Sequence, residues 1–111
     1  MNLEEYKQRA TLIRDNEIYK VYDLPELKDL SISLTELHPL KSTTGHSHDN
    51  ADEIYIFIDG EGIIEIGNQT STVKGGDIIL VPRGDFHKVH NKKETSMHFW
   101  SLFEKYEGRG K

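Results

Sequence analysis

The sequence predicts an all-β fold, a sandwich or barrel with a short N-terminal helix. Short segments rich in β-branched and aromatic residues recur along the chain, and glycine-rich turns separate them. Helical spacing of apolar residues is confined to the first residues of the chain. With 111 residues, no internal repeat and no low-complexity linker, the chain is expected to form one domain around a single core.

The first 29 residues are expected to form a helix and a strand. Apolar residues recur at helical spacing over residues 2–14, namely Leu3, Tyr6, Ala10 and Ile13. Acidic residues precede basic ones in this segment, which favours the helix dipole. Residues 17–22 are rich in Ile, Tyr and Val, which predicts a strand. We expect residues 1–29 to cover the barrel or a partner subunit.

The barrel itself is expected to span residues 30–106. Strict alternation of apolar and polar residues over 30–35 predicts a half-buried strand. Residues 53–58 form the next strand, with Glu53, Tyr55 and Phe57 on one face. The opposite face is apolar, so the N-terminal segment or a second subunit is expected to cover Ile54, Ile56 and Ile58.

The remaining strands are separated by clear turn signals. They are expected at residues 63–67, 70–73, 78–81, 86–90 and 96–103. The first two pair as a hairpin around Gly67-Asn68. Residues 107–111 are expected to be a mobile tail.

Composition and charge exclude several classes of protein. The chain has 19 acidic and 14 Lys or Arg residues and no basic stripe, which argues against nucleic-acid binding. It has no cysteine, so disulfides and thiolate chemistry are absent. No apolar stretch is long enough to cross a membrane, and the acidic start resembles no secretory signal. A cytoplasmic protein is the expectation.

Three histidines and a glutamate form the most informative pattern in the sequence. His46 and His48 lie two residues apart, so both imidazoles share one face of an extended segment. Glu53 follows at the start of the next strand, and His87 follows a Pro-Arg-Gly turn. Three imidazoles and one carboxylate are the ligands of a divalent-metal site.

These residues occur in a pattern that resembles the cupin superfamily. His46, His48, Glu53 and Gly60 match the first cupin motif, although Leu40 stands where that motif begins with glycine. Every position of the second motif is present, namely Gly76, Pro82, Gly84, His87 and Asn91.

The resemblance implies a fold, a ligand set and a partner. The fold is a cupin-type double-stranded β-helix, a conical β-barrel of two antiparallel sheets with the metal inside. The implied ligands are His46, His48, Glu53 and His87. The ion would be Mn, Fe, Ni, Co or Zn, among which the sequence does not choose. The family also suggests a homodimer that exchanges N-terminal strands.

Two further residues are candidates for proton transfer. Tyr55 shares a face with Glu53, so it either lines the pocket or packs as an aromatic core residue. His98 shares a face with Trp100 on the last strand. An inward face would make His98 an acid or base and Trp100 a sugar platform, whereas an outward face would make both interface residues.

Three functions remain open, because this barrel hosts many activities. The first is an isomerase or epimerase of a small sugar or sugar phosphate, with metal-assisted proton transfer by Tyr55 or His98. The second is a metal-dependent dioxygenase. The third is a module that binds a small ligand without turnover. In each case the partner is a small molecule.

Overall fold

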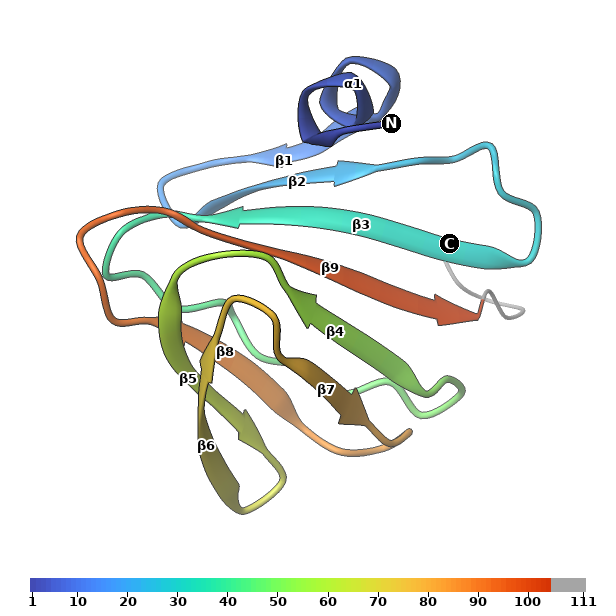
Figure 1. The fold of residues 1–111 in the computed structure, drawn as a ribbon. Helices are drawn as coiled ribbons and strands as arrows, with labels where there is room; N and C mark the ends of the chain where they lie inside the picture. The colour runs from blue at the N-terminus through green and yellow to red at the C-terminus, as the bar shows by residue number, and fades with distance from the viewer. Residues whose placement is uncertain (105–111) are drawn as a thin grey trace.

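The computed structural model describes residues 1–104 and shows two antiparallel sheets that face each other (Figure 1). The tail predicted at residues 107–111, and the last two residues of the predicted barrel, lie outside the described residues. The larger sheet has six strands in the order β1-β2-β3-β9-β4-β7, and the smaller has three in the order β6-β5-β8. The predicted all-β fold with one short N-terminal helix is confirmed.

The elements follow one another as one helix and nine strands. They are α1 (Leu3–Arg9), β1 (Thr11–Asp15), β2 (Tyr19–Asp23), β3 (Leu30–Leu37), β4 (Glu53–Phe57), β5 (Glu61–Ile66), β6 (Gln69–Lys74), β7 (Ile78–Val81), β8 (His87–Asn91) and β9 (Met97–Glu104). The predicted hairpin is present, because β5 and β6 pair from Ile66 opposite Gln69. Among the described residues, no helix is long and apolar enough to cross a membrane.

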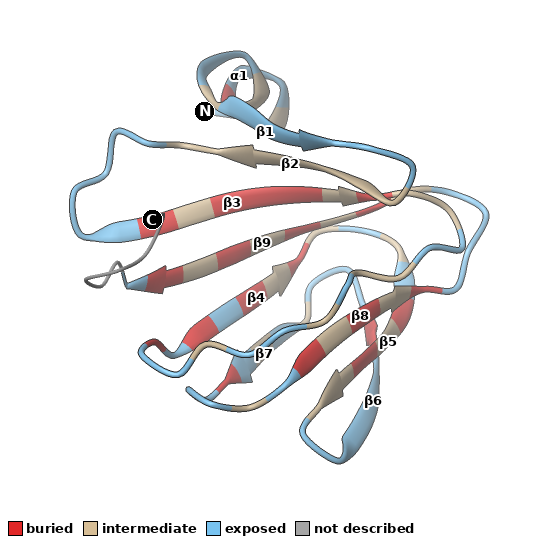
Figure 2. Ribbon diagram, turned by 180° about the vertical axis from the view of Figure 1, so that it is seen from behind, coloured by how far each residue is buried: buried red, intermediate tan, exposed pale blue. Residues whose placement is uncertain are grey.

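The core lies between the two sheets, and every second residue of β4, β8 and β9 is buried there (Figure 2). On β9 the buried residues alternate with half-buried ones, as expected for a strand with two distinct faces. Eight buried residues form the core cluster: Leu37, Tyr55, Phe57, Ile64, Val73, Val89, Met97 and Phe99. These residues come from both sheets, so the core joins the two sheets.

The predicted N-terminal helix is present, but it is shorter than the predicted segment of residues 2–14. The helix α1 ends at Arg9, and Ala10 is already extended, with φ −77° and ψ 165°. Thr11 to Asp15 then form β1, which pairs with β2 at the edge of the six-stranded sheet. The β-branched residues Thr11 and Ile13 tolerate either structure, and the backbone hydrogen bonds to β2 favour the strand.

Helix α1 covers part of the outer face of the large sheet. Its buried residue Tyr6 packs edge-on against Trp100 of β9, with ring centroids 4.7 Å apart. The Tyr6 hydroxyl lies 2.9 Å from Tyr22 O and 3.2 Å from Ile32 O, so it can donate to either. Burial, followed by the charge of Asp23, raises the pKa of Tyr6 to about 12, so this hydroxyl keeps its proton.

Leu40, which stands at the glycine position of the first motif, adopts a left-handed backbone conformation that usually favours glycine. It has φ +62° and is the one residue other than glycine with positive φ in the described part of the chain. A left-handed conformation costs a residue with a Cβ atom about 1–2 kcal/mol. The side chain is 62% exposed, so no clash adds to this cost.

Candidate metal centre

The four predicted ligands come together between the sheets. His46, His48, Glu53 and His87 each offer one ligand atom, and these atoms all lie within 4.8 Å of one another, a group that could hold a metal ion. Glu53 comes from the start of β4 and His87 from the start of β8. The two sheets therefore contribute one buried ligand each, and the loop before β4 contributes the other two.

Backbone hydrogen bonds hold that loop beside β8. The amide of His46 donates to His87 O at 3.1 Å, and the amide of His87 donates back to His46 O at 2.9 Å. Gly45, which precedes His46, has φ +83°, and an added Cβ would lie 2.7 Å from the Phe86 ring. Glycine is needed here because the chain must make a left-handed turn close against that ring.

Three of the distances between ligand atoms match those around a shared metal ion. His87 Nε2 lies 3.2 Å from His46 Nε2 and 3.3 Å from Glu53 Oε1. His48 Nε2 lies 3.4 Å from the same carboxylate oxygen. Ligands at about 2.0–2.2 Å from a common ion are separated by roughly 2.8–3.6 Å when the angle between them is near 90–110°.

Glu53 supports the same interpretation, because one of its oxygens is buried without a hydrogen bond. Its side chain is only 3% exposed, and Oε1 has no hydrogen-bond partner among the described residues. The other oxygen, Oε2, accepts a hydrogen bond from the Ser101 hydroxyl. A buried carboxylate oxygen left without a hydrogen bond is costly, and a cation at this position would satisfy it. The residues present therefore fit a divalent ion.

The protonation states of two ligands also suit metal binding. Burial, aided by the charges of His87 and His48, lowers the pKa of His46 to about 4, so its imidazole is neutral at pH 7. Burial acts to raise the pKa of Glu53, but the contacts with His87 and Ser101 outweigh it and the pKa lies below its ordinary value. Metal ligands must be neutral imidazoles and ionised carboxylates.

His87 is oriented by the backbone. Its Nδ1 lies 3.1 Å from Asp85 O. Because a carbonyl oxygen can only accept, Nδ1 carries the hydrogen and Nε2 faces the cluster. Burial acts to lower the pKa of His87, but Glu53 and the Asp85 carbonyl raise it above its ordinary value. A metal ion would therefore compete with a proton at this ligand.

A cavity of about 210 Å³ opens beside the cluster. Aromatic rings form part of its wall, and the His48 ring stacks on Phe103 with centroids 5.4 Å apart. Hydroxyl groups also line it: Tyr19, Ser33, Thr35, Thr43, Thr44, Tyr55 and Ser101. Arg14 and Asp23 are charged groups in the wall. The cavity can therefore hold a small polar molecule next to the cluster.

The structure places the two candidates for proton transfer on opposite sides of the sheet. Tyr55 is 5% exposed, lines the cavity and lies edge-on to His87, with ring centroids 5.6 Å apart. Burial raises its pKa well above 10, so its hydroxyl keeps the proton and can donate a hydrogen bond. His98 instead lies on the outer face, where Nδ1 is 3.0 Å from Asp59 Oδ1 and Nε2 is 3.2 Å from Glu36 Oε1. Its strand register turns it away from the cluster.

Sequence reasoning missed two residues that the structure brings to the site. Arg14 lies in the segment predicted as a helix, and only the strand β1 brings it beside the cavity. Ser101 belongs to neither cupin motif. Only the pairing of β9 with β4 places it opposite Tyr55 and beside Glu53. Asn91, a motif residue, has a structural role, since its side-chain nitrogen lies within hydrogen-bond distance of the carbonyls of Leu37, His38 and Thr95.

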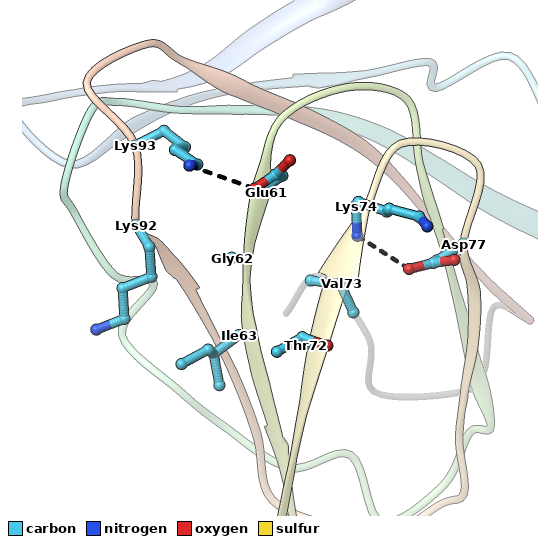
Figure 3. Close-up of a pocket in the computed structure, with 9 residues that line it drawn as sticks. All are labelled: Glu61, Gly62, Ile63, Thr72, Val73, Lys74, Asp77, Lys92 and Lys93. Atoms are coloured by element: carbon cyan, nitrogen blue, oxygen red, sulfur yellow. Dashed lines mark hydrogen bonds and ion pairs between the residues drawn. The ribbon is translucent and has the colours of Figure 1, made fainter.

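A second hollow, of about 490 Å³, lies on the small sheet away from the cluster (Figure 3). Residues of β5 and β6 and the lysines after β8 line it, and none of the four predicted ligands does. Gly62 of β5 is among the lining residues, and the backbone leaves no room for a side chain there, since an added Cβ would lie 2.1 Å from His90 O. Glu61 pairs with Lys93 at 3.3 Å on an exposed rim. Solvated lysines of this kind do not define a binding site.

Comparisons with known proteins agree with this architecture. A family model described as a cupin domain matches residues 33–103. An uncharacterised protein of Methanocaldococcus jannaschii is 32% identical over 88 residues, which are 77% of this chain and 70% of that protein. An oxalate-binding protein of Thermotoga maritima is 30% identical over 67 residues, 60% of this chain and 55% of that protein.

A solved structure supports the fold alone. An uncharacterised conserved protein of Klebsiella pneumoniae with a double-stranded β-helix domain superposes with a TM-score of 0.78 at 22% identity. The match covers 94% of this chain and 87% of that chain. The fold expected from the two sequence motifs is therefore confirmed.

Proposed function

The chain belongs to the cupin family, and we propose that it is a metal-dependent protein that acts on a small polar molecule in the 210 Å³ cavity. The observation that carries this proposal is the buried Glu53 oxygen without a hydrogen bond, surrounded by three imidazoles. His46, His48, Glu53 and His87 would hold the ion. Manganese, iron, cobalt, nickel and zinc all suit this set of ligands.

The cavity supports chemistry as well as binding. A bound divalent ion would supply positive charge that binds and polarises an oxygen of the ligand. The hydroxyls of Thr43 and Thr44 line the same cavity and can orient the ligand. The rings of Phe99 and Phe103 form an apolar part of its wall. Tyr55, which keeps its proton at neutral pH, can donate a hydrogen bond to a developing negative charge.

Two substrate classes are compatible with this site. The hydroxyl-rich wall suits a small carbohydrate, and an isomerase would need a base to move a proton. His98, one candidate for that role, lies on the outer face, and Tyr55 is a donor. The relative from Thermotoga maritima, whose name describes oxalate binding, points to a small carboxylate. These observations support the carboxylate over the carbohydrate.

Elemental analysis of the purified protein tests the metal site. We expect roughly one divalent ion per chain in the wild type and its loss in His48→Ala, because removing one imidazole leaves an incomplete set of ligands. His90→Ala is the matched control, since His90 lies on β8 like His87 but contacts Ser42 and Glu65 outside the cluster. This variant should retain the metal.

Two outcomes would change the proposal. If the wild type retains none of the five candidate metals after incubation with each, the proposal of a metal-dependent protein is wrong. If the metal is iron and the protein consumes oxygen, a dioxygenase replaces the isomerase and the ligand-binding module as the proposed function. The identity of the ion therefore narrows the reaction as well as testing the site.

A further inference from the structure

The edge strand β1 is bulged where it borders the cavity. Leu12 lies opposite Tyr22 and Arg14 lies opposite Val21, so Ile13 is an extra residue in the pairing with β2. In a regular strand, neighbouring side chains point to opposite faces. Here both Ile13 and Arg14 line the cavity. Bulges of this kind redirect side chains and are frequent beside functional sites.

Arg14 is the positively charged side chain of the cavity wall. Within residues 1–104, we find no ion pair that involves Arg14, although two carboxylates line the same cavity. Each carboxylate has a hydroxyl partner, because Asp23 accepts from Ser33 and Glu53 accepts from Ser101. Arg14 is therefore available to an incoming ligand.

The charges of the cavity favour an anion once the metal is bound. The cavity wall has one positively charged side chain, Arg14, and two negatively charged ones, Asp23 and Glu53. Histidines that bind a metal are neutral and add no charge. A divalent ion would leave one net positive charge. A guanidinium binds a carboxylate through two parallel hydrogen bonds, a geometry that a lone hydroxyl cannot match. A cavity of about 210 Å³ has room for a small dicarboxylate.

We propose that Arg14 binds one carboxylate of a small dicarboxylate whose other carboxylate is held at the cluster of His46, His48, Glu53 and His87. Arg14 is then the residue that selects for ligands with a second negative charge. The bulge in β1 turns the Arg14 side chain toward the cavity. This inference rests on the proposed metal-dependent function and names the class of its ligand.

Calorimetric titration of the metal-loaded protein tests the inference with two probes, malonate and acetate. Both carry a carboxylate for the metal, but only malonate carries a second one for Arg14. In Arg14→Gln, we expect the Kd for malonate to rise about tenfold or more and the Kd for acetate to change less than about threefold. Arg14→Lys should recover part of the malonate affinity, because it restores the charge without the planar fork.

Lys20→Gln is the matched control. Lys20 lies on β2 opposite Asp15 and does not line the cavity, so the variant removes one positive charge from the same two strands. We expect its affinity for both probes to equal that of the wild type. Metal content should be the same in the wild type and all three variants, because none of them changes a ligand of the metal.

The outcomes separate this inference from the function it rests on. A wild type that holds no metal contradicts the proposed function. A wild type that holds metal but does not bind malonate contradicts the inference alone. So does an Arg14→Gln variant that binds malonate as tightly as the wild type, or that loses acetate and malonate equally. Tighter wild-type binding of a neutral polyol such as glycerol than of malonate would also overturn it.

Discussion

Ser101 shows how a single hydroxyl can prepare the cluster for a metal. It lies on β9, is 7% exposed, and donates to Glu53 Oε2. This contact holds the carboxylate so that Oε1 faces the imidazoles. Groups that orient metal ligands in this way typically affect metal affinity by 10–100-fold.

We therefore expect Ser101→Ala to weaken metal binding about tenfold, measured by competition with a chelator of known affinity. Ser33→Ala is the matched control, because Ser33 is equally buried in the wall of the same cavity but donates to Asp23. Equal affinities in both variants would show that the hydroxyl of Ser101 does not position Glu53.

At the scale of elements, an ion-pair network fixes α1 to the large sheet. Glu36 of β3 lies 3.3 Å from Lys7 Nζ of α1 and 3.2 Å from His98 Nε2 of β9. Asp59, in the turn after β4, contacts the other nitrogen of His98. Burial acts to raise the pKa of Glu36, but His98 and Lys7 outweigh it and the pKa lies below its ordinary value.

This shift determines how stability depends on pH. Because the folded chain holds the Glu36 proton less tightly than the unfolded chain, the stabilisation is complete above the ordinary pKa of a glutamate. It is lost as the pH falls through the lowered pKa of the folded state. We expect Glu36→Gln to lower the free energy of unfolding by about 1 kcal/mol at pH 7, and by much less at about pH 3.

Urea unfolding at a series of pH values measures this difference. Glu61→Gln is the control, because the pair of Glu61 with Lys93 is more than half exposed and should contribute little. A loss of stability in Glu36→Gln that is the same at about pH 3 and pH 7 would contradict the assigned role of the charge.

At the scale of the whole molecule, the outer face of β4 and β7 has no cover among the described residues. Ile54, Ile78 and Leu80 are 40%, 63% and 68% exposed, although α1 covers Trp100 on the same side of the sheet. Ile54 lies directly opposite Leu80, so the apolar side chains form one patch. Its strand β7 is at the edge of the six-stranded sheet. A patch of this kind at a sheet edge favours association.

We expect this patch to bury itself against the same patch of a second copy, which gives a symmetric homodimer. Leu80→Glu should shift the protein to the monomer, measured by light scattering after size-exclusion chromatography. Leu30→Glu is the control, because Leu30 is also exposed but lies at the start of β3. A wild type that is monomeric up to its solubility limit would contradict the expectation.

The sequence by itself determined the family and the set of candidate ligands. His46, His48, Glu53 and His87 occur at fixed distances from turn-forming glycines and proline, so local pattern was sufficient to identify them. Alternation along residues 53–57 also placed Glu53, Tyr55 and Phe57 correctly on the buried face. These features were predictable because each depends on residues that are close in the chain.

Only the tertiary structure decided what depends on distant strands. Residues 11–15 became a strand because β2 offers them hydrogen bonds, and the bulge in that pairing brought Arg14 to the cavity. His98 faces outward because the register of β9 with β3 places it opposite Glu36. Strand pairing and register are set by contacts between residues far apart in sequence. A local sequence pattern does not show which of these contacts form.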